Sequence, residues 1–245
     1  MKLRLDKYLS NMGRGSRNEI KDDIRRGRVL VNGRNAKSGS QQVDTEDTVV
    51  HCGERVYYIP YVYLMLNKPE GYVSATQDQV HPTVIDLVPE KYRHYELFPV
   101  GRLDVDTTGL LLITNDGDFA HRVVSPVSGV EKVYDAKLSA PIGEEAVRSL
   151  YEGVEIFTKQ GRRICRAKEV APHESGACIS ITEGKFHQVK KMFEAVGVRV
   201  LQLRRIRIGG LLLDGALEPG QMRELDNRET ESIFQHRENA IEQIL

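Results

Sequence analysis

The first forty residues carry two helical patterns of apolar positions. Three apolar residues recur at the i, i+4, i+7 spacing of one helix face: Leu5, Leu9 and Met12. Ser16 followed by Glu19 predicts a capping box that opens a second helix, because each side chain can bond the backbone amide of the other residue. Ile20 and Ile24 mark the buried face of this second helix, so its basic residues should face the solvent.

A short strand pattern and a polar stretch follow the two helices. Residues 29–31, Val-Leu-Val, predict a strand, and the dipeptide Asn32-Gly33 favours a tight hairpin turn. Residues 35–55 are polar and are expected to form strands and turns. We therefore expect residues 1–58 to form a small domain of two short helices and a β region.

Strand patterns dominate the rest of the chain. Apolar runs predict strands at residues 61–66, 110–114, 130–139, 163–170, 177–183, 199–208 and 211–213. Helical patterns fall at residues 117–124, 143–152 and 187–196. Because strands and helices do not alternate regularly, the pattern favours an α+β fold with a mixed, mainly antiparallel sheet. This second domain is expected to span residues 61–230, with a C-terminal tail at residues 231–245.

Charge is distributed unevenly, although the 35 basic and 35 acidic residues cancel over the whole chain. Residues 1–40 hold 11 basic and 4 acidic residues, and residues 185–207 hold 7 basic and 1 acidic residue. An acidic segment at residues 214–245 offsets both basic segments, so the net charge of the whole chain does not reveal them. Clustered positive charge favours phosphate binding, because each neutralised phosphate releases counterions, whereas the alternative is a set of solvated helix faces.

Several protein classes are disfavoured by composition. The longest unbroken apolar stretch is residues 61–66, too short for a membrane-spanning helix, and the basic N-terminus has no apolar run behind it. Three scattered cysteines form no CxxC pair, which argues against a disulfide framework and a cysteine zinc site. We expect a cytoplasmic protein with reduced thiols.

The densest polar motif is GRLDVDTTG at residues 101–109, directly before the apolar run at residues 110–114. Glycines at both ends of a short acidic loop are typical of a scaffold that presents a carboxylate at a rigid edge. Three interpretations are open. Asp104 is a nucleophile or acid–base group, Asp104 and Asp106 bind a divalent metal, or both stabilise a turn. The metal interpretation lacks a third carboxylate at a supporting spacing.

Two further motifs are basic. EGKFHQVKKMF at residues 183–193 predicts a helix whose Lys190 and Lys191 lie away from the apolar face. These lysines could pair with a carboxylate, contact phosphate or form a solvated face, and His187 is expected to be a structural donor. In LRRIRIGG at residues 203–210, strand alternation puts Arg205 and Arg207 on one face, a candidate ledge for phosphate contacts.

In combination, the motifs resemble one family of enzymes. The basic helix pair ending in RVLVNG resembles an S4 (α-L) RNA-binding domain. GRLDVDTTGLLLITNDG at residues 101–117 resembles the motif that carries the catalytic aspartate of pseudouridine synthases. KVYDAKL at residues 132–138 resembles the motif that supplies their active-site tyrosine. The order and spacing are similar to the RsuA-type branch, which acts on small-subunit (16S) ribosomal RNA, over residues 2–227.

The resemblance implies that the chain isomerises a uridine within ribosomal RNA, with no metal, nucleotide or other cofactor. It implies Asp104 as the nucleophile, Lys190 as its basic partner and Tyr134 as the residue that stacks on the uracil. Arg102, beside the nucleophile, is a candidate for holding the opened RNA backbone. The implied partner is small-subunit RNA or a 30S assembly intermediate, bound by a monomer. The expected RNA contacts are Arg4, Lys7, Arg14, Arg17, Arg25, Arg26, Arg205 and Arg207.

Three alternatives differ in substrate or class. A synthase of the same superfamily could act on large-subunit (23S) RNA. A noncatalytic RNA-binding factor of ribosome assembly could keep the fold, although the joint presence of Asp104, Tyr134 and Lys190 argues against lost activity. A metal-dependent nucleotidyl transferase would use Asp104 and Asp106, and its activity would vanish with a chelator.

Overall fold

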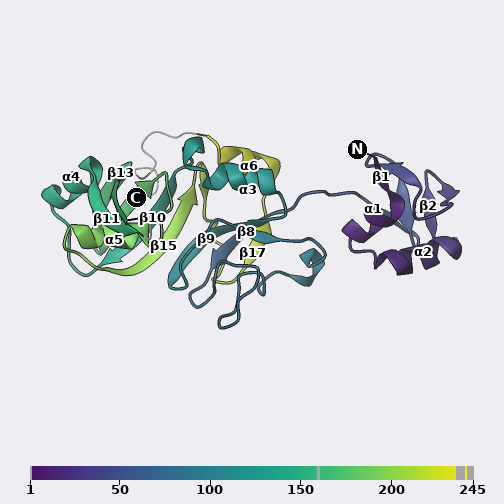
Figure 1. Ribbon diagram of the computed structural model, residues 1–245, viewed down its shortest axis with the longest axis horizontal. Helices are drawn as coiled ribbons and strands as arrows, with labels where there is room; N and C mark the ends of the chain where they lie inside the picture. Colours follow the sequence, from purple (N-terminus) through teal and green to yellow (C-terminus); the bar gives the residue numbers. More distant parts are fainter. Residues whose placement is uncertain (1, 159–160, 236–240, 242–245) are drawn as a thin grey trace. The chain divides into compact units, whose positions relative to one another are not determined.

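The computed structural model describes residues 2–158, 161–235 and 241. The chain divides into two compact units (Figure 1), of which the N-terminal unit comprises Met1–Val62 and Pro89–Glu96. The C-terminal unit comprises Tyr63–Val88 and Leu97–Leu245. No helix among the described residues is long and apolar enough to cross a membrane.

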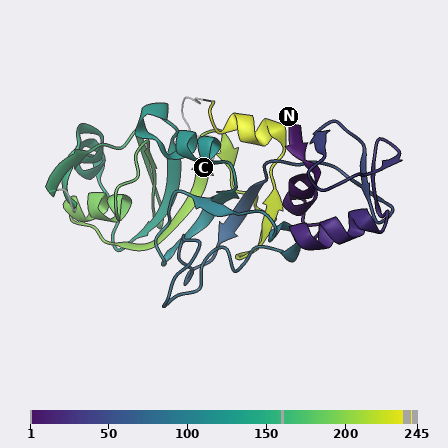
Figure 2. The ribbon, with the colours of Figure 1, turned by 45° about the vertical axis from the view of Figure 1, so that its right-hand side comes forward.

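The N-terminal unit contains the two predicted helices, α1 (Leu5–Asn11) and α2 (Arg17–Arg25). Figure 2 shows both of them in purple, packed beside the strands of this unit. Ser16 and Glu19 form the predicted capping box, and Ile20 and Ile24 are buried. The helix faces therefore lie where the apolar spacing predicted them.

The strands of the N-terminal unit form two small sheets. One has the order β3-β2-β5-β6, with bounds Arg34–Asn35, Val29–Val31, Val49–His51 and Glu54–Val56. The other pairs β1 (Lys2–Arg4) with β4 (Gln42–Asp44). Asn32 and Gly33 have φ values of 51° and 77°, the left-handed conformation that a hairpin turn of this kind requires.

The C-terminal unit is built on a nine-stranded sheet, in which seven strands have the order β13-β14-β10-β15-β9-β7-β17. Strand β16 pairs with β15, and β8 pairs with β9. The bounds are β7 Tyr63–Lys68, β8 Phe98–Val100, β9 Thr107–Thr114, β10 Lys132–Leu138, β13 Glu169–His173, β14 Gly176–Ile181, β15 Val200–Ile208, β16 Leu211–Leu212 and β17 Met222–Glu224. The β9–β15 pairing is parallel and the other pairings are antiparallel, which confirms the predicted α+β class.

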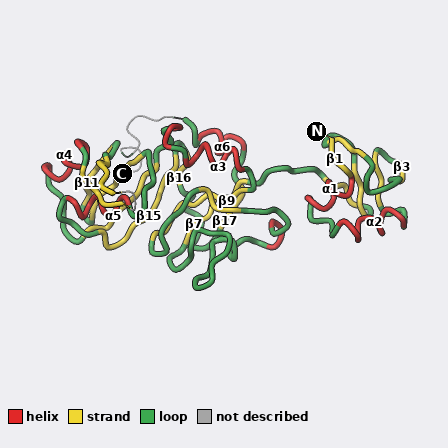
Figure 3. Tube along the Cα trace, in the orientation of Figure 1, coloured by secondary structure: helices red, strands yellow, loops and turns green. Residues whose placement is uncertain are grey.

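Helices and a hairpin flank this sheet (Figure 3). They are α3 (Gly117–Val124), α4 (Glu144–Glu152), α5 (Gln188–Ala195), α6 (Asn227–Ser232) and the β11–β12 hairpin, Val154–Thr158 and Gly161–Cys165. Phe119 and Val123 of α3 pack with Leu110 and Leu112 of β9 in the main core. The buried strand β9 therefore begins directly after the polar loop, residues 101–106, that the sequence analysis identified.

The sequence prediction was wrong at residues 163–170, expected to form one strand. The chain leaves β12 after Cys165 and bends at Lys168, and the Ala167 amide between them donates to the Leu150 carbonyl, so β12 and β13 belong to different sheets. Strands β8, β11 and β17 were not predicted, because they are short, with three, five and three residues respectively. Residues 236–240 and 242–245 of the expected tail lie outside the described residues.

Candidate active site

Asp104 lies in the loop that joins β8 to β9. Its carbonyl accepts a hydrogen bond from the Thr107 amide at 3.0 Å, which closes a tight turn. The turn is therefore closed by main-chain atoms, and the Asp104 carboxylate takes no part in this hydrogen bond. That carboxylate is about one-quarter exposed, with a relative accessibility of 27%.

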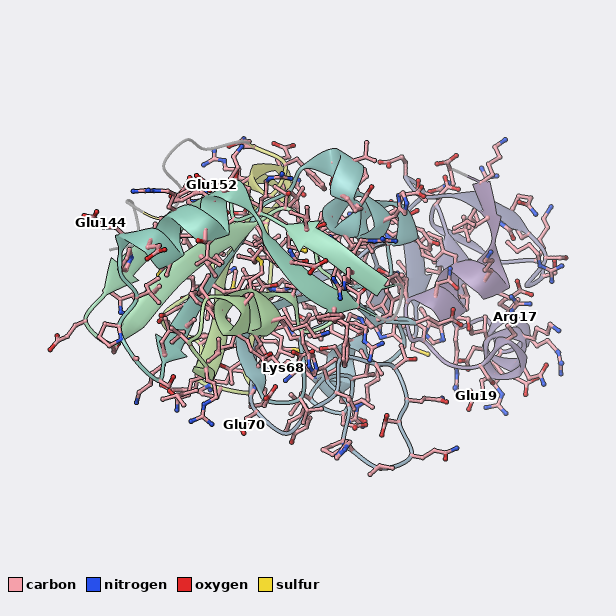
Figure 4. The ribbon with its side chains drawn as sticks, turned by 60° about the vertical axis from the view of Figure 1, so that its left-hand side comes forward. Arg17, Glu19, Lys68, Glu70, Glu144 and Glu152 are labelled. Atoms are coloured by element: carbon pink, nitrogen blue, oxygen red, sulfur yellow. The ribbon has the colours of Figure 1, made fainter. Side chains whose placement is uncertain are left out.

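Lys68, at the end of β7, supports this loop from inside the protein (Figure 4). Its side chain is fully buried, and its ammonium group donates to the carbonyls of Val105 at 3.3 Å, Thr107 at 2.9 Å and Pro69 at 3.0 Å. Burial lowers the pKa of Lys68 to about 8, against the opposing attraction of nearby carboxylates. Three carbonyl acceptors compensate the buried ammonium group and fix the loop at the same time.

Ser74 supports the same loop from a second side. Its hydroxyl donates to the Leu103 carbonyl and accepts from the Leu103 amide, both at 3.0 Å. The Gly71 amide donates to the Val105 carbonyl at 2.9 Å. These bonds hold both neighbours of Asp104, and hence the direction of its side chain.

Gly109 allows the close strand approach beneath the loop. Its φ is +96°, and a Cβ atom there would lie 2.2 Å from the Arg205 carbonyl oxygen. The parallel pairing of β9 with β15, in which Gly109 is opposite Arg205, therefore requires glycine at this position. Gly109, the last residue of the acidic motif, is therefore required for strand pairing in the sheet as well as for the loop.

Lys190, on α5, brings positive charge to both aspartates of the motif. Its ammonium nitrogen lies 3.4 Å from Asp104 and 2.6 Å from Asp106. His187, which precedes α5 with a left-handed φ of 53°, lies with Nε2 3.4 Å from Asp104. Partial burial is the largest single influence and acts to raise the pKa of Asp106. The hydrogen bond and the charge of Lys190, with smaller contributions from a backbone hydrogen bond and His187, together hold that pKa below its ordinary value.

One pocket is lined by residues from motifs that lie far apart in the sequence. Arg102, Asp104 and Tyr134 line it together with His187 and Leu203. Tyr134 is 8% exposed, on the central strand β10. An aromatic ring, a carboxylate and a cation thus face a single space, as a site for a planar, polar substrate group requires.

Arg205 and Arg207 do not form the exposed ledge that strand alternation predicted. They are 4% and 3% exposed, and their Nε atoms donate to the carbonyls of Leu110 and Gly209. A register shift between Val133 and Tyr134 interrupts the regular pairing of β10 with β15 at this place. The Arg205 guanidinium lies 6.0 Å from the Tyr134 ring centre, so this arginine packs behind the pocket.

The basic residues predicted to contact RNA in the N-terminal unit lie mostly on its surface. Lys7, Arg17 and Arg26 are exposed. Three others form ion pairs: Arg4 with Asp6, Arg14 with Glu54 and Arg25 with Asp22. The surface is therefore basic but partly neutralised by its own carboxylates.

Among the described residues, two groups offer three metal-capable atoms within 4.8 Å of one another. One is Asp23, His51 and Cys52, and the other is Asp135, His173 and Cys178. Neither contains Asp104 or Asp106, and in each group the histidine is hydrogen-bonded to the aspartate.

Lys68 and Ser74 are site-supporting residues that the sequence analysis missed, and His187 was not linked to Asp104. The available signal for Lys68 was its position directly after an apolar strand pattern. A lysine buried there needs fixed hydrogen-bond partners, because lysine is seldom fully buried without them. Ser74 carried no such signal.

Comparison with known proteins agrees with these features. The family model described as RNA pseudouridylate synthase matches residues 62–195, and the S4 domain model matches residues 3–49. A protein of Bacillus subtilis described as an uncharacterized RNA pseudouridine synthase is 45% identical, over 93% of this chain and 96% of that protein. Ribosomal small subunit pseudouridine synthase A of Escherichia coli K12 is 37% identical, over 94% and 100%. A crystal structure of a pseudouridylate synthase is 36% identical with a TM-score of 0.65, covering 94% of this chain and 99% of the other.

Proposed function

Because this chain belongs to the RNA pseudouridine synthase family, we propose that it isomerises a uridine of small-subunit ribosomal RNA to pseudouridine. The observation that carries the proposal is the Asp104 carboxylate, held beside Lys190 in a pocket that Tyr134 also lines. The similarity to ribosomal small subunit pseudouridine synthase A over nearly the whole chain favours the small subunit over the large-subunit alternative.

The reaction breaks the bond from ribose C1′ to uracil N1, turns the base and joins C5 to C1′. It involves no redox change and no transfer to another molecule. We propose Asp104 as the nucleophile, which must be ionised to act. His187 Nε2 lies 3.4 Å from one oxygen of that carboxylate and Lys190 Nζ lies 3.4 Å from the other, so a lysine stands directly beside the proposed nucleophile.

The remaining pocket residues have roles in holding the base. Tyr134 presents an aromatic ring for stacking on the uracil, with Arg205 packed behind it. The target nucleotide must leave its stack to reach Asp104, at a cost of about a few kcal/mol. Arg102 is exposed at the pocket edge and is proposed to hold the RNA backbone in this opened form.

The N-terminal unit is proposed to select the site on the ribosomal RNA. A pocket for one uridine cannot distinguish that uridine from others, whereas phosphate contacts elsewhere position the RNA. Lys7, Arg17 and Arg26 are exposed and suited to such contacts. We place the enzyme in the cytoplasm, with ribosomal RNA or a 30S assembly intermediate as its substrate.

The first test compares the two carboxylates of the motif. Unmodified small-subunit and large-subunit RNA are incubated with the protein, with and without EDTA, and pseudouridine is mapped by carbodiimide labelling and primer extension. We expect one new stop in the small-subunit RNA. Asp104→Asn should lower turnover by about 10⁴-fold or more with RNA affinity retained, because it removes the nucleophile. Asp106→Asn is the matched control and should stay within about tenfold of the parent protein.

Other results would change the proposal in defined ways. A stop only in large-subunit RNA would keep the chemistry and change the substrate. Loss of activity with EDTA would favour the metal-dependent alternative. No stop in either RNA or in partly assembled 30S subunits would leave a noncatalytic RNA-binding factor.

A further inference from the structure

The β11–β12 hairpin exposes one side of a two-stranded sheet. On its other side, Cys165 accepts a hydrogen bond from Lys185, which lines the pocket. Cross-strand pairing places Glu155 opposite Ile164 and Phe157 opposite Arg162, so these four side chains share a face. Phe157 and Ile164 are 64% and 63% exposed. The other face carries Val154, Ile156 and Cys165, which are buried.

Phe186 extends this exposed surface towards the catalytic carboxylate. It is 57% exposed and stacks on His187 with ring centres 3.7 Å apart and planes inclined by 20°. His187 in turn reaches Asp104. An exposed aromatic ring therefore lies one residue away from a residue that lines the catalytic pocket.

Lys191 connects the hairpin to Phe186. Its ammonium group donates to the Phe157 carbonyl at 2.7 Å and lies 5.2 Å from the Phe186 ring centre. Arg162 lies 5.2 Å from the Phe157 ring centre and 3.5 Å from the Glu155 carboxylate, an exposed ion pair in which a phosphate can replace the carboxylate. Each exposed ring thus has a cation beside it. We name Phe157, Arg162, Ile164, Phe186 and Lys191 the aromatic–cationic surface.

Single exposed apolar side chains are common and need no explanation, and Val127 in this unit is one of them. The aromatic–cationic surface differs because its rings and cations adjoin one another and the pocket. Alternating π faces and positive charge are complementary to unpaired RNA, whose bases stack on aromatic rings and whose phosphates attract cations. Flipping one nucleotide also removes a stacking partner from its neighbours, so their base faces become available to an aromatic ring.

We propose that the aromatic–cationic surface binds the unpaired nucleotides that flank the target uridine. Phe186 stacks on a base next to the flipped uridine, and Phe157 stacks on a base farther along the strand. Lys191 and Arg162 attract the phosphates between them. The inference rests on the proposed function, since it takes the strand in the pocket to be the RNA substrate.

The test separates binding from chemistry in the full-length protein. Phe157→Ala and Phe186→Ala are assayed for KM and kcat on the small-subunit RNA, with Val127→Ala as the exposed apolar control. We expect each aromatic variant to raise KM about tenfold, because stacking on one base is lost, while kcat changes less than about twofold. The control should match the parent protein.

A second measurement locates the contact directly. RNA with 5-iodouridine at each position flanking the target is irradiated with Asp104→Asn protein, and the cross-linked peptides are identified by mass spectrometry. Cross-links to Phe186 or Phe157 are expected. Unchanged KM values together with cross-links elsewhere would overturn the inference. The aromatic–cationic surface would then be a candidate for binding a protein instead of RNA.

The two proposals fail in different ways. If the parent protein converts no RNA, yet Phe157→Ala weakens RNA binding and the cross-links fall on this surface, the catalytic proposal fails and the surface stands. If the parent protein converts uridine while both aromatic variants bind and react like it, the surface proposal fails alone.

Discussion

Basic side chains lie near aspartates both on helix α2 and at the Asp104 loop. The two regions differ in how far these basic side chains are exposed to water. On α2, Arg25 lies 3.0 Å from Asp22, and both side chains are more than half exposed. Under the loop, Lys68 is fully buried and bonded to three carbonyls. An exposed pair contributes little to folding, whereas a buried cation must be compensated by fixed partners.

The difference explains why similar residues suit different tasks. Exposed arginines on α2 can exchange one anionic partner for another, as phosphate binding on an RNA surface requires. Lys68 cannot make that exchange, because its three acceptors belong to the backbone that positions Asp104. Lys190 is intermediate, with a partly exposed ammonium group between two carboxylates.

The largest expected effect is on the buried side of the comparison. Lys68→Met should lower the free energy of unfolding by about 3 kcal/mol, because three buried carbonyls lose their donor. It should also lower kcat/KM, since the loop that carries Asp104 loses its support. Lys21→Met on α2 is the control, with an expected change within about 0.5 kcal/mol. Urea denaturation measures both, and equal stabilities would contradict the assigned role of Lys68.

Next in size is the effect of removing the partner of the two carboxylates. Lys190→Met should lower kcat/KM about a hundredfold, because the ionised Asp104 loses its nearest lysine, and Lys190→Arg should restore most of it. The same change should raise the pKa of Asp106, which Lys190 now holds below its ordinary value. Carboxyl NMR titration measures this shift. An unmoved Asp106 titration would show that the ion pair does not form in solution.

A pH-dependent effect of intermediate size is expected from Lys132. It is buried on β10 and donates to the Val130 carbonyl, and burial followed by repulsion from Arg205 lowers its pKa to about 8. In the unfolded chain the pKa is near 10.5. Between these values only the unfolded chain binds the proton, so folding stability rises with pH.

Subtracting the stability of Lys132→Met from that of the parent protein isolates this contribution. The difference should increase by about 2 kcal/mol in favour of the parent protein from about pH 7.5 to about pH 10. Lys137→Met, on the same strand but exposed, is the matched control for removing a lysine from β10. A flat difference for Lys132 would refute the depressed pKa.

The smallest expected effect is on the exposed side of the comparison. The double variant Arg17→Gln/Arg26→Gln should weaken binding to small-subunit RNA about tenfold at low salt, with kcat unchanged. Its log–log salt slope should be shallower by about 1.5, because two phosphate contacts are lost. Lys137→Met serves again as a control. A parental slope in the double variant would remove α2 from the RNA interface.

The amino-acid pattern by itself determined the local structure. Apolar spacing predicted α1 and α2, and the Ser16–Glu19 capping box and the Asn32-Gly33 turn formed as expected because their hydrogen bonds and dihedral angles depend on near neighbours. The long apolar strands were predicted for the same reason. The acidic motif also marked Asp104, since glycines and carboxylates between a loop and a buried strand are visible in sequence.

Tertiary structure decided what distant segments do to one another. Lys68 and Ser74 come from β7 and the loop after it, yet they fix the loop of Asp104 about thirty residues later. Arg205 and Arg207 have the alternation of an exposed strand face, but the neighbouring strands bury both of them. Burial and hydrogen-bond partners depend on which strands become neighbours. The order of the strands is determined by the packing of the whole sheet, so no short segment of sequence reveals it.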